Sequence, residues 1–154
     1  MITLLAALAL SAQLLPQAER LPPPDFSDKE VVATVDALLA TLETGDAPAL
    51  LKLVYPEGRV TGSGTFAGGA SGLRSRSFAE YAARMTPGSG FVERITNPVI
   101  EQDGDVALVW APFTITMGGK LVSCGYDHFD LVRENGAWKV MNLTFSSRTE
   151  GCGA

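Results

Sequence analysis

Positively charged residues are scarce in this chain, which has 12 Lys and Arg against 17 Asp and Glu among 154 residues. The formal net charge is −5 at pH 7. Binding to the phosphates of nucleic acid or to anionic lipid needs clustered Lys and Arg. The composition therefore argues against nucleic acid and membrane surfaces as partners.

Histidine is rarer still, because His128 is the single one. A catalytic zinc needs three protein ligands, and no spacing in the sequence offers three. On one extended strand Cys124 and His128 would lie roughly 13 Å apart, too far for a Cys–His nucleophile. We therefore expect no metal site and no cofactor.

The chain has two cysteines, Cys124 and Cys152, and lacks the Cys-x-x-Cys motif that lowers a thiol pKa. In an oxidising compartment they would form one disulfide between the C-terminal tail and a strand. In the cytosol they would be two free thiols. We favour the disulfide, since the N-terminus resembles an export signal.

That N-terminus holds an uncharged apolar run, residues 2–15, which is shorter than the roughly 20 residues that span a bilayer. Residues 1–18 resemble a signal peptide, although no Lys or Arg precedes the run. A membrane anchor or a buried helix is the alternative. Residues 19–26 form a proline-rich spacer, and residues 27–152 the folded domain. We expect a periplasmic or secreted protein whose mature form has no membrane segment.

Three helices are expected in the first half of the domain. Ser27–Glu30 and Ser77–Glu80 both match the capping-box pattern. Apolar residues recur at three-to-four spacing between Val31 and Leu42, and Gly45 supplies a stop. Asp46 can cap a second, short helix.

Residues 62–72 are rich in glycine but lack the Gly-Lys-Ser/Thr of a phosphate-binding loop. We expect a flexible loop after a short strand at Val60, with a mobile lid over a pocket as the alternative.

From Phe91 onward, apolar and β-branched runs are separated by residue pairs that favour two-residue hairpin turns. Only the upstream helices can cover one face of such a sheet. The predicted fold class is therefore α+β, with three helices on a curved antiparallel sheet and a pocket between them. The four predicted strands are residues 91–102, 105–117, 120–134 and 137–147.

Local sequence adds a family resemblance. The segments concerned are residues 91–95, 109–113, 123–125, 129–133 and 136–140. Together with the order of elements, they resemble exported bacterial SnoaL-like or lumazine-binding-like members of the nuclear transport factor 2-like (NTF2-like) superfamily over residues 28–152. The resemblance implies a cone-shaped fold. It implies no particular reaction, since members range from isomerases and dehydratases to transport adaptors. Ser123 stands where such relatives often carry His.

Asp127 is the candidate catalytic residue. It shares a strand face with Phe129 and Leu131, so inward-pointing neighbours would leave its carboxyl group in an apolar environment that raises its pKa. Such a group can act as a general base or as a neutral acid. The alternative is a strand carboxylate bonded to a backbone amide, an Arg or water. Arg94 is expected to pair with a surface carboxylate such as Glu93.

Two functional hypotheses follow. The first is a non-catalytic exported module that holds a small apolar ligand or dimerises through the outer sheet face. The second is an acid–base enzyme, similar to ketosteroid isomerases or dehydratases, that uses Asp127. We expect a homodimer because both sheet faces carry apolar residues. The expected pocket residues are Tyr55, Trp110, Phe113, Ser123, Phe129 and Asn142.

Overall fold

The computed structural model describes residues 28–153. The expected signal peptide (1–18), the spacer (19–26) and Ser27 of the first capping box lie outside these residues. Within the described residues, no helix has both the length and the apolar character needed to cross a membrane.

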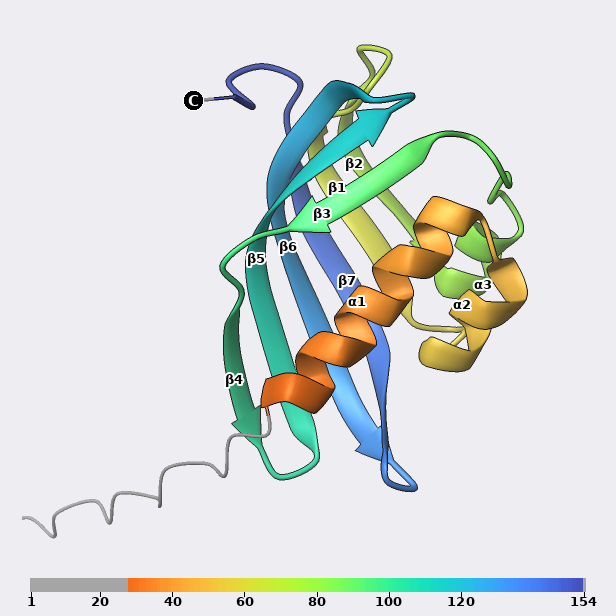
Figure 1. Cartoon of the computed structure of the whole chain (residues 1–154), viewed down its shortest axis with the longest axis vertical. Coiled ribbons are helices and arrows are strands. Elements are labelled where there is room, and N and C mark those ends of the chain that lie inside the picture. The colour runs from red at the N-terminus through yellow and green to blue at the C-terminus, as the bar shows by residue number, and fades with distance from the viewer. Residues whose placement is uncertain (1–27, 154) are drawn as a thin grey trace, which may run out of the picture.

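Helices and strands follow one another in an α+β order that confirms the predicted fold class (Figure 1). The sheet has seven strands in the order β2-β1-β7-β6-β5-β3, and β4 also pairs with β5. Apart from the parallel pair β1–β7, neighbouring strands are antiparallel. The elements are α1 (Asp28–Thr44), α2 (Ala47–Leu53), β1 (Arg59–Thr65), β2 (Ser71–Ser77), α3 (Phe78–Ala82), β3 (Phe91–Ile95), β4 (Val99–Asp103), β5 (Val106–Met117), β6 (Lys120–Glu134) and β7 (Ala137–Ser147).

Three of the predicted helix boundaries are confirmed: the end of α1 and the starts of α2 and α3. Gly45 follows α1 with a φ of 72°, a left-handed conformation that glycine adopts without strain. The Ala49 amide donates to Asp46 Oδ1 at 2.9 Å, which caps α2. At α3 the Ser77 amide donates to Glu80 Oε2 at 2.8 Å, and the Glu80 amide donates to Ser77 Oγ at 3.1 Å. This reciprocal pair is the expected capping box.

The predicted meander is present, with one strand divided. Gly118-Gly119 and Asn135-Gly136 form two-residue turns with positive φ, as expected. The other hairpin turns at Gly104-Asp105, one residue later than predicted. The expected strand 91–102 is broken at Asn97-Pro98, where Asn97 has a φ of 45°. Its halves, β3 and β4, pair with different parts of β5.

The expectation of a flexible loop over residues 62–72 is wrong, because most of this segment belongs to the β1–β2 hairpin. Glycine lowers strand propensity, and the sequence pattern hid the strands for that reason. Here Gly62 serves packing, since a Cβ at this position would overlap the Phe145 ring. Parallel pairing of β1 with β7 supplies a long-range contact that local propensity does not register.

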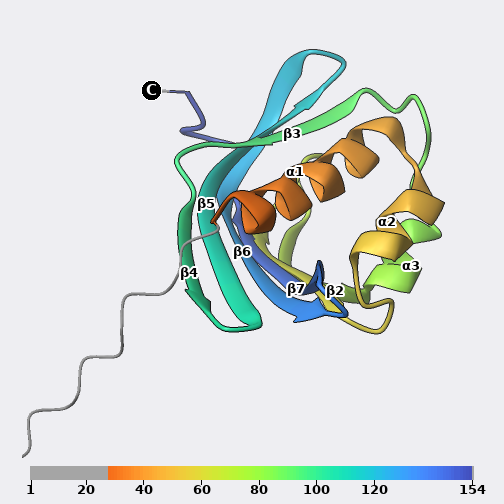
Figure 2. The same ribbon diagram turned by 60° about the horizontal axis from the view of Figure 1, so that its bottom comes forward.

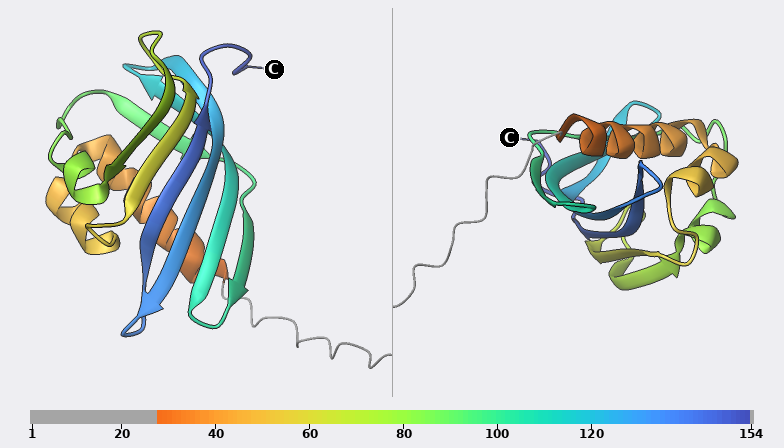
Figure 3. Two further views of the ribbon diagram at one scale, coloured as in Figure 1. Left: turned by 180° about the vertical axis from the view of Figure 1, so that it is seen from behind. Right: turned by 90° about the horizontal axis from the view of Figure 1, so that it is seen from below.

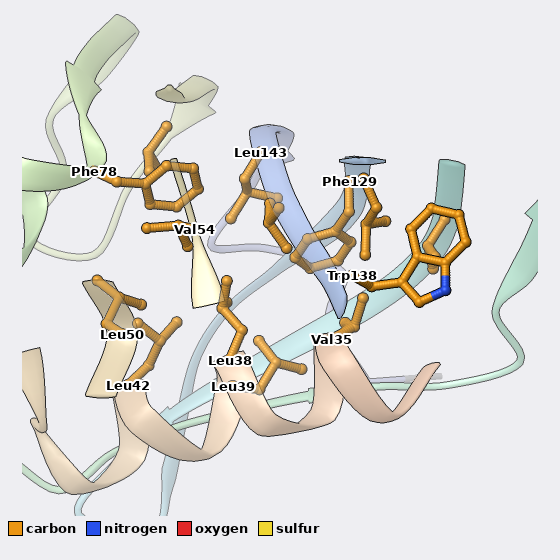
Figure 4. Close-up of a cluster of buried hydrophobic side chains, with 14 of the residues drawn as sticks. Val35, Leu38, Leu39, Leu42, Leu50, Val54, Phe78, Phe129, Trp138 and Leu143 are labelled. Atoms are coloured by element: carbon orange, nitrogen blue, oxygen red, sulfur yellow. The ribbon is translucent and has the colours of Figure 1, made fainter. Parts of the chain in front are cut away.

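The sheet curves around α1, and α2 and α3 lie at one side of the concave face (Figure 2). The apolar side of α1 packs on the sheet, where Val35, Leu38 and Leu39 contribute to the same buried cluster as Phe129 and Trp138 (Figure 4). The convex face, seen from behind, has no helix of the described chain over it (Figure 3). The concave face is therefore the only one that helices bury.

The predicted disulfide between Cys124 and Cys152 is present, and it joins the C-terminal tail to β6. The two Cα atoms lie 5.5 Å apart, as is usual for a disulfide. Just before the tail, the Cys124 amide donates to the Arg148 carbonyl at 3.0 Å, and the Arg148 amide donates back at 2.9 Å. Cys124 alternates with inward-facing Ser123 and Gly125, so the tail crosses the convex side of β6.

Candidate functional site

A cavity of about 270 Å³ lies between the helices and the concave face of the sheet. Its walls are mainly apolar and come from α1, α3, the β1–β2 hairpin and four strands of the sheet. Lining residues include Leu38, Leu42, Val60, Phe66, Phe78, Tyr81, Phe91, Glu93, Ile115, Ser123, Leu143 and Phe145.

The polar groups of this wall include the hydroxyls of Tyr81 and Ser123 and the carboxyl group of Glu93. Glu93 on β3 pairs with Ile115 on β5, which pairs in turn with Ser123 on β6. Directly paired residues project from the same face of a sheet. Glu93 and Ser123 therefore lie on the concave side, two strands apart, and both are buried.

Asp127 lies on the same face of β6 as Ser123, further along the strand, between Ala111 of β5 and Phe145 of β7. The residue is 0% exposed, and neither carboxyl oxygen has a hydrogen-bond partner among the described residues. Phe129, two positions away, is also fully buried. Phe145 lines the cavity, whereas the Asp127 oxygens are covered. An ionised carboxylate without a partner is strongly disfavoured in such a place.

The three acidic groups of the concave face influence one another. Burial raises the pKa of Glu93 to about 7. Burial, followed by the charge of Glu93, raises the pKa of Asp127 well above its ordinary value. Burial, followed by the charge of Glu93, raises the pKa of Tyr81 to about 12. At neutral pH Tyr81 is therefore neutral and Glu93 is close to its midpoint, while burial disfavours the ionised form of Asp127.

Three of the predicted pocket residues lie on the concave face. Ser123 lines the cavity. Phe113 is buried, and its ring meets that of Phe145 edge-on, with centroids 6.1 Å apart. Phe129 is fully buried in the main apolar cluster beside α1.

The other three predicted pocket residues lie elsewhere. Trp110 is on the convex face, 47% exposed, and stacks on Tyr126 with ring centroids 5.3 Å apart. Tyr55 lies under the Lys139 ammonium group, which is 5.5 Å from the centre of its ring. Asn142 accepts the Arg59 amide at 2.9 Å at the start of β1. None of the three lines the cavity.

Glu93 and Tyr81 are site residues that the sequence analysis missed. Arg94 pairs with a surface carboxylate as expected, but that carboxylate is Glu43, whose Oε2 lies 2.7 Å from Arg94 Nη2; the suggested partner Glu93 is buried. The available signal was the period of two along a strand, which places Glu93 on the same face as Phe91. Within residues 28–153, no three His, Cys, Asp or Glu side chains cluster as metal ligands would.

Residues 27–144 match the sequence model of the SnoaL-like domain. The chain belongs to the SnoaL-like family. No curated protein matches the sequence. The match spans nearly all of the residues that the structure describes, and it includes every residue of the cavity wall except Phe145 and Ser147.

Solved structures that resemble this SnoaL-like domain share its fold at low sequence identity. A protein of unknown function with a cystatin-like fold from Nostoc punctiforme has a TM-score of 0.64 at 14% identity, covering 80% of this chain and 92% of that one. An NTF2-like protein from Novosphingobium aromaticivorans has a TM-score of 0.63 at 14% identity, covering 82% and 84%. A protein from Streptomyces avermitilis, proposed to be a dehydratase of the NTF2-like family, has a TM-score of 0.59 at 20% identity, covering 78% and 94%.

Proposed function

We propose that this SnoaL-like domain binds a small, largely apolar molecule in the concave cavity. The observation that carries this proposal is an apolar cavity of about 270 Å³ whose wall includes only a few polar groups. Ligand sites combine apolar walls with a few well-placed polar groups, in volumes of roughly 300–1,000 Å³. The cavity is slightly smaller than that range, which favours a compact ligand of up to about three rings or a short chain.

A fluorescent probe tests this proposal. N-phenyl-1-naphthylamine is uncharged and becomes brighter in apolar surroundings, so binding can be followed by titration. Ile115→Trp would fill the cavity from β5, because Ile115 lies in its wall. The matched control is Thr114→Trp, which places the same side chain at the exposed neighbouring position.

We expect Ile115→Trp to weaken probe binding at least about tenfold, while Thr114→Trp binds like the wild type. Circular dichroism would establish that both variants fold. The proposal is wrong if the wild type does not bind the probe, or if both variants bind it as the wild type does.

Acid–base chemistry in the same cavity is a second candidate function. It is favoured by one observation, that the carboxyl groups of Glu93 and Asp127 share a buried sheet face and Asp127 has no bonded partner. Glu93 is the better candidate for the base, because it lines the cavity and has a pKa of about 7. Tyr81 would donate a hydrogen bond to a substrate oxygen. Asp127 would be a positioning residue, because burial and then the charge of Glu93 raise its pKa and favour its neutral, proton-donating form.

Such a site would move a proton next to a carbonyl group. Glu93 would take a proton from the carbon beside the carbonyl, Tyr81 would stabilise the enolate oxygen, and Glu93 would return the proton at another carbon. Cyclohex-3-enone, which isomerises to the conjugated cyclohex-2-enone, is a probe small enough for the cavity. Absorbance follows the reaction.

The expected result is an isomerisation rate that rises with pH through about 7 and is lost in Glu93→Gln. Asp127→Asn should keep the midpoint of that profile, because burial raises the pKa of Glu93 and Asp127 adds no charge to it, and should lower the rate rather than abolish it. Equal rates for the wild type and Glu93→Gln at every pH would reject the catalytic role and leave the binding role.

Export to the periplasm or the exterior is part of the same proposal. Its support is the Cys124–Cys152 disulfide, since disulfides persist mainly in oxidising compartments. N-terminal sequencing of the protein from its native cells is the test. A mature chain that begins after Ala12 or Ala18 is expected, and one that begins at Met1 would contradict export.

A further inference from the structure

Arginine side chains gather at one side of the cavity in a chain that is otherwise acidic. Arg74 lines the cavity itself, and Arg76 and Arg84 line a second hollow of about 240 Å³. The two hollows adjoin, because Leu42 and Tyr81 are in the walls of both. We call Arg74, Arg76 and Arg84 the arginine rim.

Strand register explains why two of these side chains turn toward the cavity. On β2, Arg76 pairs with Val60 of β1 and Arg74 pairs with Gly62. Val60 is buried and lines the cavity, so the concave side is the face it shares with its partner Arg76. Arg74 is two positions from Arg76 and shares that face. The β1–β2 hairpin therefore presents two guanidinium groups from one strand.

The arginine rim lacks internal counter-charges. Within residues 28–153 none of its three guanidinium groups lies within 4.0 Å of a carboxylate or donates a hydrogen bond to a described residue. Arg74 instead lies over the Phe66 ring, 4.3 Å from its centre. Glu80 is close enough for its charge to interact with Arg84, but its Oε2 accepts the Ser77 amide of the capping box.

We propose that the ligand of this domain is an amphipathic anion, with its apolar body in the cavity and a single anionic group, such as a carboxylate, on the arginine rim. This inference rests on the proposed binding function and adds the charge of the ligand. Guanidinium groups bind carboxylates and related anions through short, charge-assisted hydrogen bonds. An apolar cavity that adjoins unpaired arginines suits a molecule with both parts.

The rim arginines have one ordinary structural explanation. β2 is an edge strand of the sheet, and inward-pointing charges at an edge prevent pairing with another chain. If the arginines only protect the edge strand, their positive charge is needed, but the affinity of the cavity does not depend on the charge of the ligand. The discriminating quantity is therefore the ratio of affinities for a charged and an uncharged ligand of the same shape.

Two probes provide this ratio. 8-Anilinonaphthalene-1-sulfonate has the aromatic body of N-phenyl-1-naphthylamine and adds one sulfonate. Both are titrated against the wild type, Arg76→Gln and Arg76→Lys. Arg133→Gln is the matched control, since it removes one arginine charge beside Asp105, away from the cavity.

We expect the wild type to bind the sulfonate probe about tenfold more tightly than the uncharged one. Arg76→Gln should lose most of that preference while binding the uncharged probe as before, and Arg76→Lys and Arg133→Gln should keep it. Added salt should weaken only the sulfonate probe. Equal affinity of the wild type for both probes, or equal weakening of both by Arg76→Gln, would overturn the anionic ligand while the cavity proposal stands. Failure of both probes to bind the wild type would overturn both proposals.

Discussion

Charged residues lie in opposite environments on the two faces of the sheet. On the concave face, Glu93 and Asp127 are both buried, and the charge of Glu93 acts on Asp127. Asp127 has no hydrogen-bond partner in the described chain. On the convex side, charged residues pair in contact with water, as when Lys139 Nζ lies 3.3 Å from Glu134 Oε2. Burial without a partner costs free energy, whereas exposed pairs change it little.

This difference indicates where the protein accepts a loss of stability. A purely structural sheet would place apolar residues at positions 93 and 127, as it does at the neighbouring Phe129 and Leu131. Groups that are buried, unpartnered and shifted in pKa concentrate at functional sites. We therefore expect activity at the concave face and assembly through the convex face.

The largest expected effect concerns the disulfide that fixes the tail to the convex face. Replacing both cysteines, Cys124→Ala and Cys152→Ala, should lower the free energy of unfolding by roughly 3.5 kcal/mol, because the bond closes a loop of 28 residues in the unfolded chain. Urea unfolding at pH 7 measures this loss. Binding of N-phenyl-1-naphthylamine should be unchanged. A loss below about 1 kcal/mol would show that the tail is held by other contacts.

Glu93→Gln should stabilise the protein at high pH. Burial raises the pKa of Glu93 from 4.5 to about 7, so the folded chain keeps a proton that the unfolded chain releases between these values. The unfolded state then binds fewer protons, and stability falls as the pH rises through this window, by on the order of 3 kcal/mol in total. Glu93→Gln has no carboxyl group at this position and should not lose stability in this way.

Urea unfolding at pH 4 and pH 8 compares the stability of the wild type with that of Glu93→Gln. We expect similar stability at pH 4 and a variant that is more stable by roughly 3 kcal/mol at pH 8. The exposed Glu101→Gln is the control, and it should change little at either pH. A wild type and a Glu93→Gln variant that respond alike to pH would mean that Glu93 ionises normally in the folded state.

Features set by neighbouring residues were predictable from the sequence. Gly118-Gly119 and Asn135-Gly136 specify their turns through residues that tolerate positive φ, and Asp46 caps α2 with its own side chain. The β1–β2 hairpin was not predictable in this way. Its glycines are poor strand formers, and it depends on pairing with β7 and on the Phe145 ring over Gly62.

The site was predictable in part for the same reason. Alternation along one strand placed Asp127 with Phe129 and Leu131, and all three are fully buried. The interaction of Asp127 with Glu93 depends on how β3, β5 and β6 align, which no local pattern reveals. Trp110 was expected in the pocket from residue type, but it alternates with buried Val109 and Ala111 and faces outward.

An intermediate effect is expected at the exposed aromatic residues of the convex face. Trp110 and Tyr126 stack there, and Val99, paired with Trp110, is 57% exposed. We expect a homodimer through this face, as the sequence predicted, and Trp110→Ser should weaken it about thirtyfold, equivalent to about 2 kcal/mol. Light scattering over a dilution series measures the dimer. A wild type with the mass of one chain would contradict this expectation.

The smallest effect is expected for the exposed ion pair Lys139–Glu134 on the convex face, whose Nζ and Oε2 atoms lie 3.3 Å apart. A double-mutant cycle with Lys139→Gln and Glu134→Gln should give a coupling energy below about 1 kcal/mol, reduced further by salt. Thermal unfolding of the four proteins provides the cycle. A coupling energy near that of the Glu93 effect would remove the contrast between the two faces.

The concave face holds two carboxyl groups, Glu93 and Asp127, that resist ionisation because they are buried. Carbon-13 NMR of the side-chain carboxyl groups, titrated from pH 3 to pH 9 with assignments from Glu93→Gln and Asp127→Asn, measures this resistance directly. We expect Glu93 to titrate near pH 7 and Asp127 to have a pKa well above its ordinary value. Titration of both groups below about pH 5, as in exposed carboxylates, would contradict this expectation.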